Sequence, residues 1–404
     1  MSDPPKHPSD QELFALAPED EPSAGADMQG GRPGAEPAPT TGLKKRVVPD
    51  PPEIDPAKGR QTLGFLFVLA LAAFAVMAAV GTLNTLADPY GMIGLKLLPS
   101  ATTSDRTIKA DAIEALKQPP QLVVLGSSRS MRYQPSYLEE KTGLRTFNAG
   151  VNGIGGTADA WAMTNFIADT WPDSQPKYFW LLDVESFVPF KVQGRTANEP
   201  RLAQYVGEAS ARHSVRALAR AVAQNRTTLF SWVTAKDSLR VIVNRDQAKV
   251  KASKYRDTFL PDGMLRQRLW TEKEWAKRFP KSVKRYGDLY RNAYKELDPE
   301  AQSYFERTLK LMNDQGATPL IVLTPINPKL LEVLGPLGWP ERHQQVLDYV
   351  ASLQGTYDFV FVDNTDITNF GADPQQFYDG VHMTTINTQR AIDYVLQQTG
   401  GLPK

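Results

Sequence analysis

The feature that most constrains this chain is an apolar segment near its N-terminus that carries no charge. Between Thr62 and Ala87 there is no Asp, Glu, Lys or Arg, and Leu, Phe, Val and Ala dominate the run. An α-helix rises about 1.5 Å per residue, so about 20 apolar residues cross the hydrocarbon core of a bilayer. The cores of soluble domains rarely supply so long an uncharged run, and a signal peptide would have a much shorter preceding segment. We therefore predict a transmembrane helix over residues 61–87.

Charged residues on the two sides of this segment predict its orientation. Five basic residues lie just before it, namely Lys44, Lys45, Arg46, Lys58 and Arg60. Asp88 follows it, and the first basic residue beyond it is Lys96. Because Lys and Arg are enriched on the cytoplasmic side of membrane helices, we expect the N-terminus in the cytoplasm. The prediction is a single-pass protein of the cell membrane with residues 88–404 outside the cytoplasm.

The residues before the apolar segment have the composition of a disordered region. Twelve of the 31 prolines lie within residues 1–60, and apolar residues there are sparse. Such a segment buries too little apolar surface to offset the entropy of ordering the chain. We expect residues 1–60 to form a disordered cytoplasmic tail.

Beyond residue 88, short apolar runs alternate with helical patterns. Apolar runs at 122–125, 145–148, 178–182, 320–323 and 359–362 predict five strands. Helical patterns cover about 157–170, 299–315, 340–353 and 385–398. Strands that alternate with helices favour an α/β domain with a parallel sheet and helices on both faces. In such domains functional groups gather at the carboxyl ends of the strands.

Chemistry-bearing residues stand at these predicted strand ends. A serine-rich turn at 126–130 follows the first strand, and a glycine-rich segment at 148–156 follows the second. The sequence Asp379-Gly380-Val381-His382 precedes the last helix. This is the layout of a Ser/His/Asp acyl-transfer site in the chain order Ser, Asp, His. Among the four histidines, His382 is the one with a carboxylate three residues away at such a position.

The residue types fit nucleophilic catalysis. A serine hydroxyl is a poor nucleophile until a base takes its proton. His382 could take that proton, with Asp379 fixing its tautomer and orientation. Backbone N–H groups in glycine-rich turns can meet the developing oxyanion. The chain contains no cysteine, which excludes a catalytic thiol and a Cys-ligated zinc site, and we find no metal-ligand or cofactor motif.

Together these motifs resemble those of the SGNH (GDSL-like) hydrolase superfamily. The membrane segment makes the chain similar to the membrane-anchored branch that serves bacterial cell-envelope O-acylation, such as the alginate O-acetylation proteins and the D-alanine-transfer protein of teichoic-acid modification. The match covers roughly residues 118–190 and 315–400. The resemblance implies an SGNH-like three-layer domain. It also implies Ser128 as the nucleophile, where Gly126-Ser127-Ser128 stands for the family's Gly-Asp-Ser, with Asp379 and His382 in the family's Asp-x-x-His.

The resemblance further implies an oxyanion hole, and here the chain departs from the family's pattern. The family's second-block glycine best matches Gly153, with Gly150 as the rival. Where the family has Gly-x-Asn-Asp, this chain has Asp183-Val184-Glu185-Ser186. A carboxylate cannot donate to an oxyanion unless it is protonated. Either another donor such as Asn152 serves, or Glu185 points elsewhere, or the site is catalytically weak.

Residues 191–296 interrupt the alternation of strands and helices with a basic helical insertion. Residues 201–300 hold 22 Lys and Arg against 11 Asp and Glu, with aromatic residues interleaved. That mixture can indicate single-stranded nucleic acid, but the expected extracytoplasmic location argues against nucleic acid as a partner. A lid that faces anionic lipid or an acidic glycan fits, and so does a plain charged insertion. Arg129 and Arg132 would meet an anionic substrate or, more simply, lie on a solvated helix face.

The combined expectation is a serine-dependent O-acyltransferase or esterase that acts on a cell-envelope polysaccharide or a related acyl acceptor. The resemblance implies the membrane and an integral membrane O-acyltransferase as partners, with no cofactor and no metal. Within the enzyme class, a simple carboxylesterase or a glycan deacetylase remains open. A different class also remains open, in which a non-catalytic SGNH-like domain binds glycan or scaffolds an acylation complex.

Overall fold

A computed structural model describes the parts of the chain on which the following account rests. These are residues 56–89, 93, 97–98, 104–153, 156–188, 196, 199–206, 226–243, 256–266, 269–294 and 296–403. The chain divides into two compact units, Met1–Thr82 and Leu83–Lys404.

Five apolar segments of the second unit form one parallel sheet. They are β1 (Leu122–Gly126), β2 (Thr146–Asn148), β3 (Lys177–Leu182), β4 (Leu320–Leu323) and β5 (Val360–Asp363), in the order β2-β1-β3-β4-β5. Each neighbouring pair is parallel. The central strands β1, β3 and β4 are almost wholly buried, which explains why they read as continuous apolar runs. The prediction of an α/β domain with a parallel sheet is confirmed.

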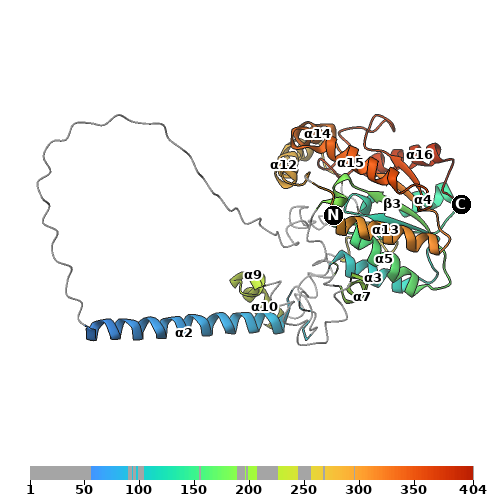
Figure 1. The fold of residues 1–404 in the computed structure, drawn as a ribbon. Coiled ribbons are helices and arrows are strands. Elements are labelled where there is room, and N and C mark those ends of the chain that lie inside the picture. Colours follow the sequence, from blue (N-terminus) through green and yellow to red (C-terminus); the bar gives the residue numbers. More distant parts are fainter. Residues whose placement is uncertain are drawn as a thin grey trace, which may run out of the picture. The chain divides into compact units, whose positions relative to one another are not determined.

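Helices cover both faces of this sheet (Figure 1). One face carries α3 (Asp105–Ala115), α5 (Thr157–Thr170), α13 (Pro299–Asp314) and α15 (Trp339–Ser352), which share a core with Val123, Trp180 and Ile321. The other face carries α4 (Pro135–Thr142) and α16 (Thr385–Thr399), which share a core with Val124, Leu181 and Val322. Successive strand residues point to opposite faces, so adjacent positions feed two different cores.

Local signals set the bounds of these helices. Asp298 accepts a hydrogen bond from the Glu300 N–H and caps α13, whose first residue is Pro299. Asn327 caps α14 (Pro328–Leu334) in the same way through the Lys329 N–H. The helices predicted at 157–170, 299–315, 340–353 and 385–398 are confirmed, and each end differs by at most one residue.

The apolar segment forms one long helix, α2 (Pro56–Ala87). Within it, Gln61–Ala87 is long and apolar enough to cross a membrane, which is consistent with single-pass anchoring. The helix begins at Pro56, five residues before the predicted start, because proline fits the first turn of a helix. The prediction of disorder is therefore wrong for residues 56–60. The rest of that predicted tail, residues 1–55, lies outside the described residues.

The described parts of the predicted insertion are largely helical. They include α7 (Pro200–Ala203), η3 (Gln204–Val206), α9 (Arg226–Leu229), α10 (Trp232–Val243) and α12 (Glu272–Tyr290). Helix α12 joins the core on the α16 face through Phe279, and the Trp275 indole N–H donates to the Phe377 carbonyl at 2.7 Å. The last helix of the insertion is thus part of the wall around the loop that carries His382.

Candidate active site

The side chains of Ser128, His382 and Asp379, the first of them far from the other two in the sequence, are linked in series by hydrogen bonds. Ser128 Oγ lies 2.7 Å from His382 Nε2, although the two residues are 254 positions apart. His382 Nδ1 lies 2.8 Å from Asp379 Oδ2 and 3.1 Å from Oδ1. An ionised carboxylate can only accept, so Nδ1 carries the proton and Nε2 is left to accept from the Ser128 hydroxyl. The structure therefore brings together the three residues that the sequence predicted as a triad.

In the turn after β1, Ser128 is more exposed than the neighbouring serines Ser127 and Ser130. Gly126 has φ +142°, and a Cβ there would lie 2.5 Å from the Leu181 carbonyl oxygen, so only glycine fits. Ser127 and Ser130 are buried, and the Ser130 hydroxyl donates to the Ser127 carbonyl at 2.7 Å. Ser128 is half-buried and faces His382. It therefore combines a basic partner with access from solvent.

The loop that carries the base is held by its own aspartate. Asp379 Oδ1 accepts the backbone N–H groups of Val381 at 2.9 Å and His382 at 2.8 Å. Burial by itself would raise the pKa of Asp379. The charge and ring N–H of His382, with the two backbone donors, outweigh burial and lower this pKa to about 2. Asp379 is therefore ionised at neutral pH and fixes both the loop and the imidazole.

This lowered pKa predicts that the stabilising contribution of Asp379 is lost in acid. The folded-state pKa of about 2 lies below the ordinary value of 3.8, so the contribution is complete above about pH 4 and disappears as the pH falls through 2. A shift of this size corresponds to about 2–3 kcal/mol. We expect the full-length protein and its Asp379→Asn variant, unfolded by urea in detergent micelles, to differ by this free energy at pH 5 and to converge near pH 2. A constant difference across this range would contradict the prediction.

A buried charged network lies beside Ser128. The Arg129 guanidinium donates to Glu185 Oε2 at 2.7 Å and to Thr324 Oγ1 at 3.1 Å, and lies 3.6 Å from Asp183 Oδ1. Glu185 also accepts the Tyr294 hydroxyl at 2.7 Å. Burial would lower the pKa of Arg129, but Asp183 and Glu185 raise it well above its ordinary value. This network joins the ends of β1, β3 and β4 next to Ser128.

Both arginines that follow Ser128, Arg129 and Arg132, are buried. Only 5% of Arg129 is exposed, so its predicted place on a solvated helix face is wrong, and its guanidinium is bound by protein carboxylates rather than free for a substrate. Arg132 is also buried, at 7% exposure, and its guanidinium lies 4.4 Å from the centre of the Tyr378 ring. Of the alternatives for Glu185, the structure shows that its carboxylate binds Arg129 and Tyr294.

Three tyrosines from the insertion support the site, and the sequence analysis did not single them out. Tyr286 donates to Asp379 Oδ2 at 3.3 Å, Tyr294 donates to Glu185, and Tyr290 stacks on Tyr286 with ring centres 5.8 Å apart. Burial, together with neighbouring carboxylates, raises the pKa of all three hydroxyls, which therefore remain protonated donors. Their spacing of four residues was the available signal, although α12 ends at Tyr290 and Tyr294 lies beyond it.

The two residues predicted for the oxyanion hole lie beside a different ion pair. Arg106 and Asp159 are paired through two hydrogen bonds, and a Cβ on Gly153 would lie 3.3 Å from Arg106 Nη2. The Asn152 backbone N–H donates to Asp105, and its carbonyl accepts from Arg106 at 3.1 Å. The backbone donor of Asn152 is thus occupied, which leaves its side-chain amide. The oxyanion role of Gly153 and Asn152 stays a prediction.

Other backbone groups stand nearer to the serine turn. The Gly150 N–H donates to Asn148 Oδ1 at 3.0 Å, so this rival to Gly153 is already engaged. Gly156, at the start of α5, packs against the turn, and a Cβ there would lie 3.7 Å from the Ser127 nitrogen. Within the described part of the chain, the Ser128 N–H has no hydrogen-bond acceptor. Gly156 and the Ser128 N–H thus both belong to the backbone at the serine turn.

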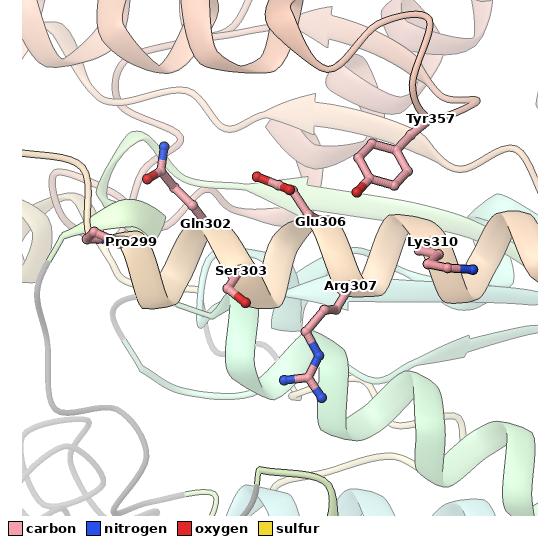
Figure 2. Close-up of a pocket in the computed structure, with 7 residues that line it drawn as sticks. All are labelled: Pro299, Gln302, Ser303, Glu306, Arg307, Lys310 and Tyr357. Carbon is pink, nitrogen blue, oxygen red and sulfur yellow. The ribbon is translucent and has the colours of Figure 1, made fainter.

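Two further features bear on what the described residues can bind. No group of three or more His, Cys, Asp or Glu residues with the geometry of a metal site occurs among them. A surface hollow lies along α13, where Gln302, Glu306 and Arg307 line it and Tyr357 reaches over it (Figure 2). Glu306 already accepts the Tyr349 hydroxyl at 2.8 Å. None of the lining residues is Ser128, Asp379 or His382.

Comparison of the sequence with known proteins does not assign the chain to a family. No family model matches the chain, and no curated protein matches it significantly.

Proposed function

We propose that this chain is a membrane-anchored serine acyltransferase or acylesterase in which Ser128 carries the acyl group. The observation that carries the proposal is the hydrogen-bonded chain from Ser128 through His382 to a buried, ionised Asp379. Each group has the partner that its role requires, and the nucleophile is the accessible member.

The geometry supports a two-step reaction. In the first step His382 Nε2 takes the Ser128 proton while Oγ attacks the carbonyl carbon of an acyl ester, and the leaving alcohol then takes that proton from His382. In the second step His382 takes a proton from an acceptor hydroxyl or from water, whose oxygen attacks the carbonyl carbon of the Ser128 ester. The bond to Oγ then breaks, and His382 returns the proton to Oγ, which restores the Ser128 hydroxyl and the neutral imidazole. A sugar hydroxyl as acceptor gives transfer, and water gives hydrolysis. Asp379 stabilises the imidazolium in both steps.

The Arg129–Glu185 pair bears on how an oxyanion is tolerated at this site. An unpaired carboxylate at position 185 would oppose a developing negative charge nearby. Here Arg129 donates to one oxygen of Glu185 and Tyr294 to the other, so this carboxylate is not unpaired. The departure from the family's asparagine is therefore compatible with acyl chemistry.

The substrate class and partners belong to the same proposal. The resemblance to SGNH proteins of envelope O-acylation, together with the candidate membrane helix, supports a cell-envelope polysaccharide as acyl acceptor and an integral membrane O-acyltransferase as donor partner. The basic flank before residue 61 supports an N-terminus in the cytoplasm and a catalytic domain outside it.

Covalent labelling tests the proposal directly. We expect a fluorophosphonate to modify the full-length protein in detergent micelles, and mass spectrometry of peptides to place the adduct on Ser128. Ser128→Ala should abolish labelling, because it removes the hydroxyl that lies 2.7 Å from His382 Nε2. Ser127→Ala should label as the parent does, because Ser127 is buried and its Oγ accepts the Arg129 N–H at 3.2 Å.

Two outcomes would count against this proposal. An adduct on Ser127 would show that the nucleophile has been misplaced by one residue. A folded protein that resists labelling altogether would favour the non-catalytic scaffold.

A further inference from the structure

The last turn of α2 is tied to the insertion by a buried asparagine. The Asn84 amide donates to the Leu229 carbonyl at 2.6 Å and to the Ser231 carbonyl at 3.3 Å, and its Oδ1 accepts the Ser238 hydroxyl at 2.8 Å. Asn84 is fully buried, and it belongs to the same compact unit as α9 and α10. Helix α10 is therefore fixed to a point three residues before the end of α2.

One face of α10 is used in this contact, and another face exposes large apolar side chains. Thr234, Ala235, Ser238 and Val241 are buried. Trp232 is 65% exposed, Leu239 50% and Val243 74%, and they recur at positions i, i+7 and i+11, which form one stripe along the helix. Phe230, just before α10, is 50% exposed. A contiguous apolar surface of this kind marks a contact with a membrane or a partner.

The position of Asn84 identifies the membrane as the partner that contacts the apolar stripe of α10. The candidate span Gln61–Ala87 has 27 residues. At about 1.5 Å per residue it extends about 40 Å, the thickness of a bilayer with its headgroup regions. Asn84 therefore falls at headgroup depth on the side where α2 ends. Any element bonded to Asn84 lies at that depth as well, and α10 is such an element.

The composition of α10 fits the same place. A tryptophan at the start of a helix with an apolar stripe is typical of helices that lie in the membrane interface. Lys236 and Arg240 are exposed on the same helix, where long basic side chains reach lipid phosphates.

We propose that α10 lies in the membrane interface beside the exit of α2, with Trp232, Leu239 and Val243 among the lipid acyl chains. The second unit would then contact the bilayer through α10 as well as through the end of α2. This second contact restricts rotation about α2 and holds the domain that carries Ser128 at a fixed height above the lipid. The inference does not depend on the acyl chemistry.

The cysteine-free sequence allows a clean test. A nitroxide would be attached to a single cysteine in three variants of the full-length protein, Trp232→Cys, Leu239→Cys and Val243→Cys. Each labelled variant would be placed, one copy per disc, in nanodiscs of phosphatidylethanolamine and phosphatidylglycerol. Power saturation would compare accessibility to oxygen, which partitions into lipid, with accessibility to a water-soluble nickel chelate. We expect oxygen to be favoured several-fold at all three positions.

Two matched positions serve as controls. Lys310→Cys, on the exposed side of α13, should favour the nickel chelate, and Arg240→Cys, about a quarter turn from the stripe on α10, should favour oxygen less than the stripe does. Circular dichroism of each labelled variant would show that the fold is kept. Stripe positions that resemble Lys310 would overturn the proposal. Low accessibility of the stripe positions to both oxygen and the nickel chelate would also overturn it, because protein rather than lipid would then cover α10. If accessibility were low only in nanodiscs that hold two copies, the covering protein would be a second copy of the chain.

Discussion

Replacement of Ser128 by alanine is expected to remove nearly all ester turnover, a loss of about a million-fold by analogy with other serine triads. His382→Ala should lose about as much, because without the imidazole the hydroxyl stays protonated and unreactive. The hydrogen bond of 2.7 Å between Oγ and Nε2 makes the two residues a single unit. The double variant should therefore be no slower than either single variant.

Asp379 contributes to the same unit through orientation. Asp379→Asn should lower turnover by about 10,000-fold, because an amide at this position favours the wrong imidazole tautomer. The two backbone N–H groups that Oδ1 accepts can still be met by the asparagine oxygen, so the loop should keep its shape. The loss should appear in kcat rather than in KM for a small activated ester.

The measurement is the hydrolysis of p-nitrophenyl acetate by the full-length protein in detergent micelles. Ser303→Ala is the matched control, since it makes the same chemical change on the exposed side of α13 and should leave the rate unchanged. If the losses from Ser128→Ala and His382→Ala multiplied in the double variant, the two residues would act independently and the triad would be refuted.

Much of the fold was predictable because buried parallel strands leave a strong local pattern. The runs Leu122–Leu125 and Leu320–Leu323 are apolar at every position, since both faces of these strands are covered by helices. The four predicted helices start within one residue of the expected positions. The proximity of the three triad residues was predictable for a related reason, since parallel strands place their carboxyl ends at one edge.

The burial of Arg129 could not be predicted in this way. An arginine after a strand is by default solvated, and the carboxylate that holds it, Glu185, is 56 residues away in the chain. The contact between Asn84 and Leu229 spans 145 residues and depends on two amide groups, which leave no periodic signal. The tyrosines at 286, 290 and 294 did carry a helical spacing. Their partners Asp379 and Glu185, however, are about 100 residues away in the chain, and no local pattern contains such contacts.

The second large effect is expected from the charged network beside the nucleophile. Arg129→Met should destabilise the full-length protein by about 3–5 kcal/mol, because it leaves the buried carboxylates of Glu185 and Asp183 without their cation. Urea unfolding followed by tryptophan fluorescence measures this loss. The matched control is Arg291→Met, which breaks an ion pair of similar length, 2.8 Å to Asp288, between side chains that are more than half exposed. Since exposed pairs contribute about 0–1 kcal/mol, the control should change stability little.

A double variant separates the ion pair from the packing of the arginine stem. Removing Glu185 as well, in Arg129→Met/Glu185→Leu, takes away one of the uncompensated charges, so the double variant should be more stable than the sum of the two single losses predicts. The Tyr294 hydroxyl loses its acceptor in that variant, and Asp183 keeps the Thr324 hydroxyl at 2.6 Å, so the recovery should be partial. If Arg129→Met changed stability no more than Arg291→Met, the guanidinium would not be paired in the folded protein, and the balance of charge next to Ser128 would need another source.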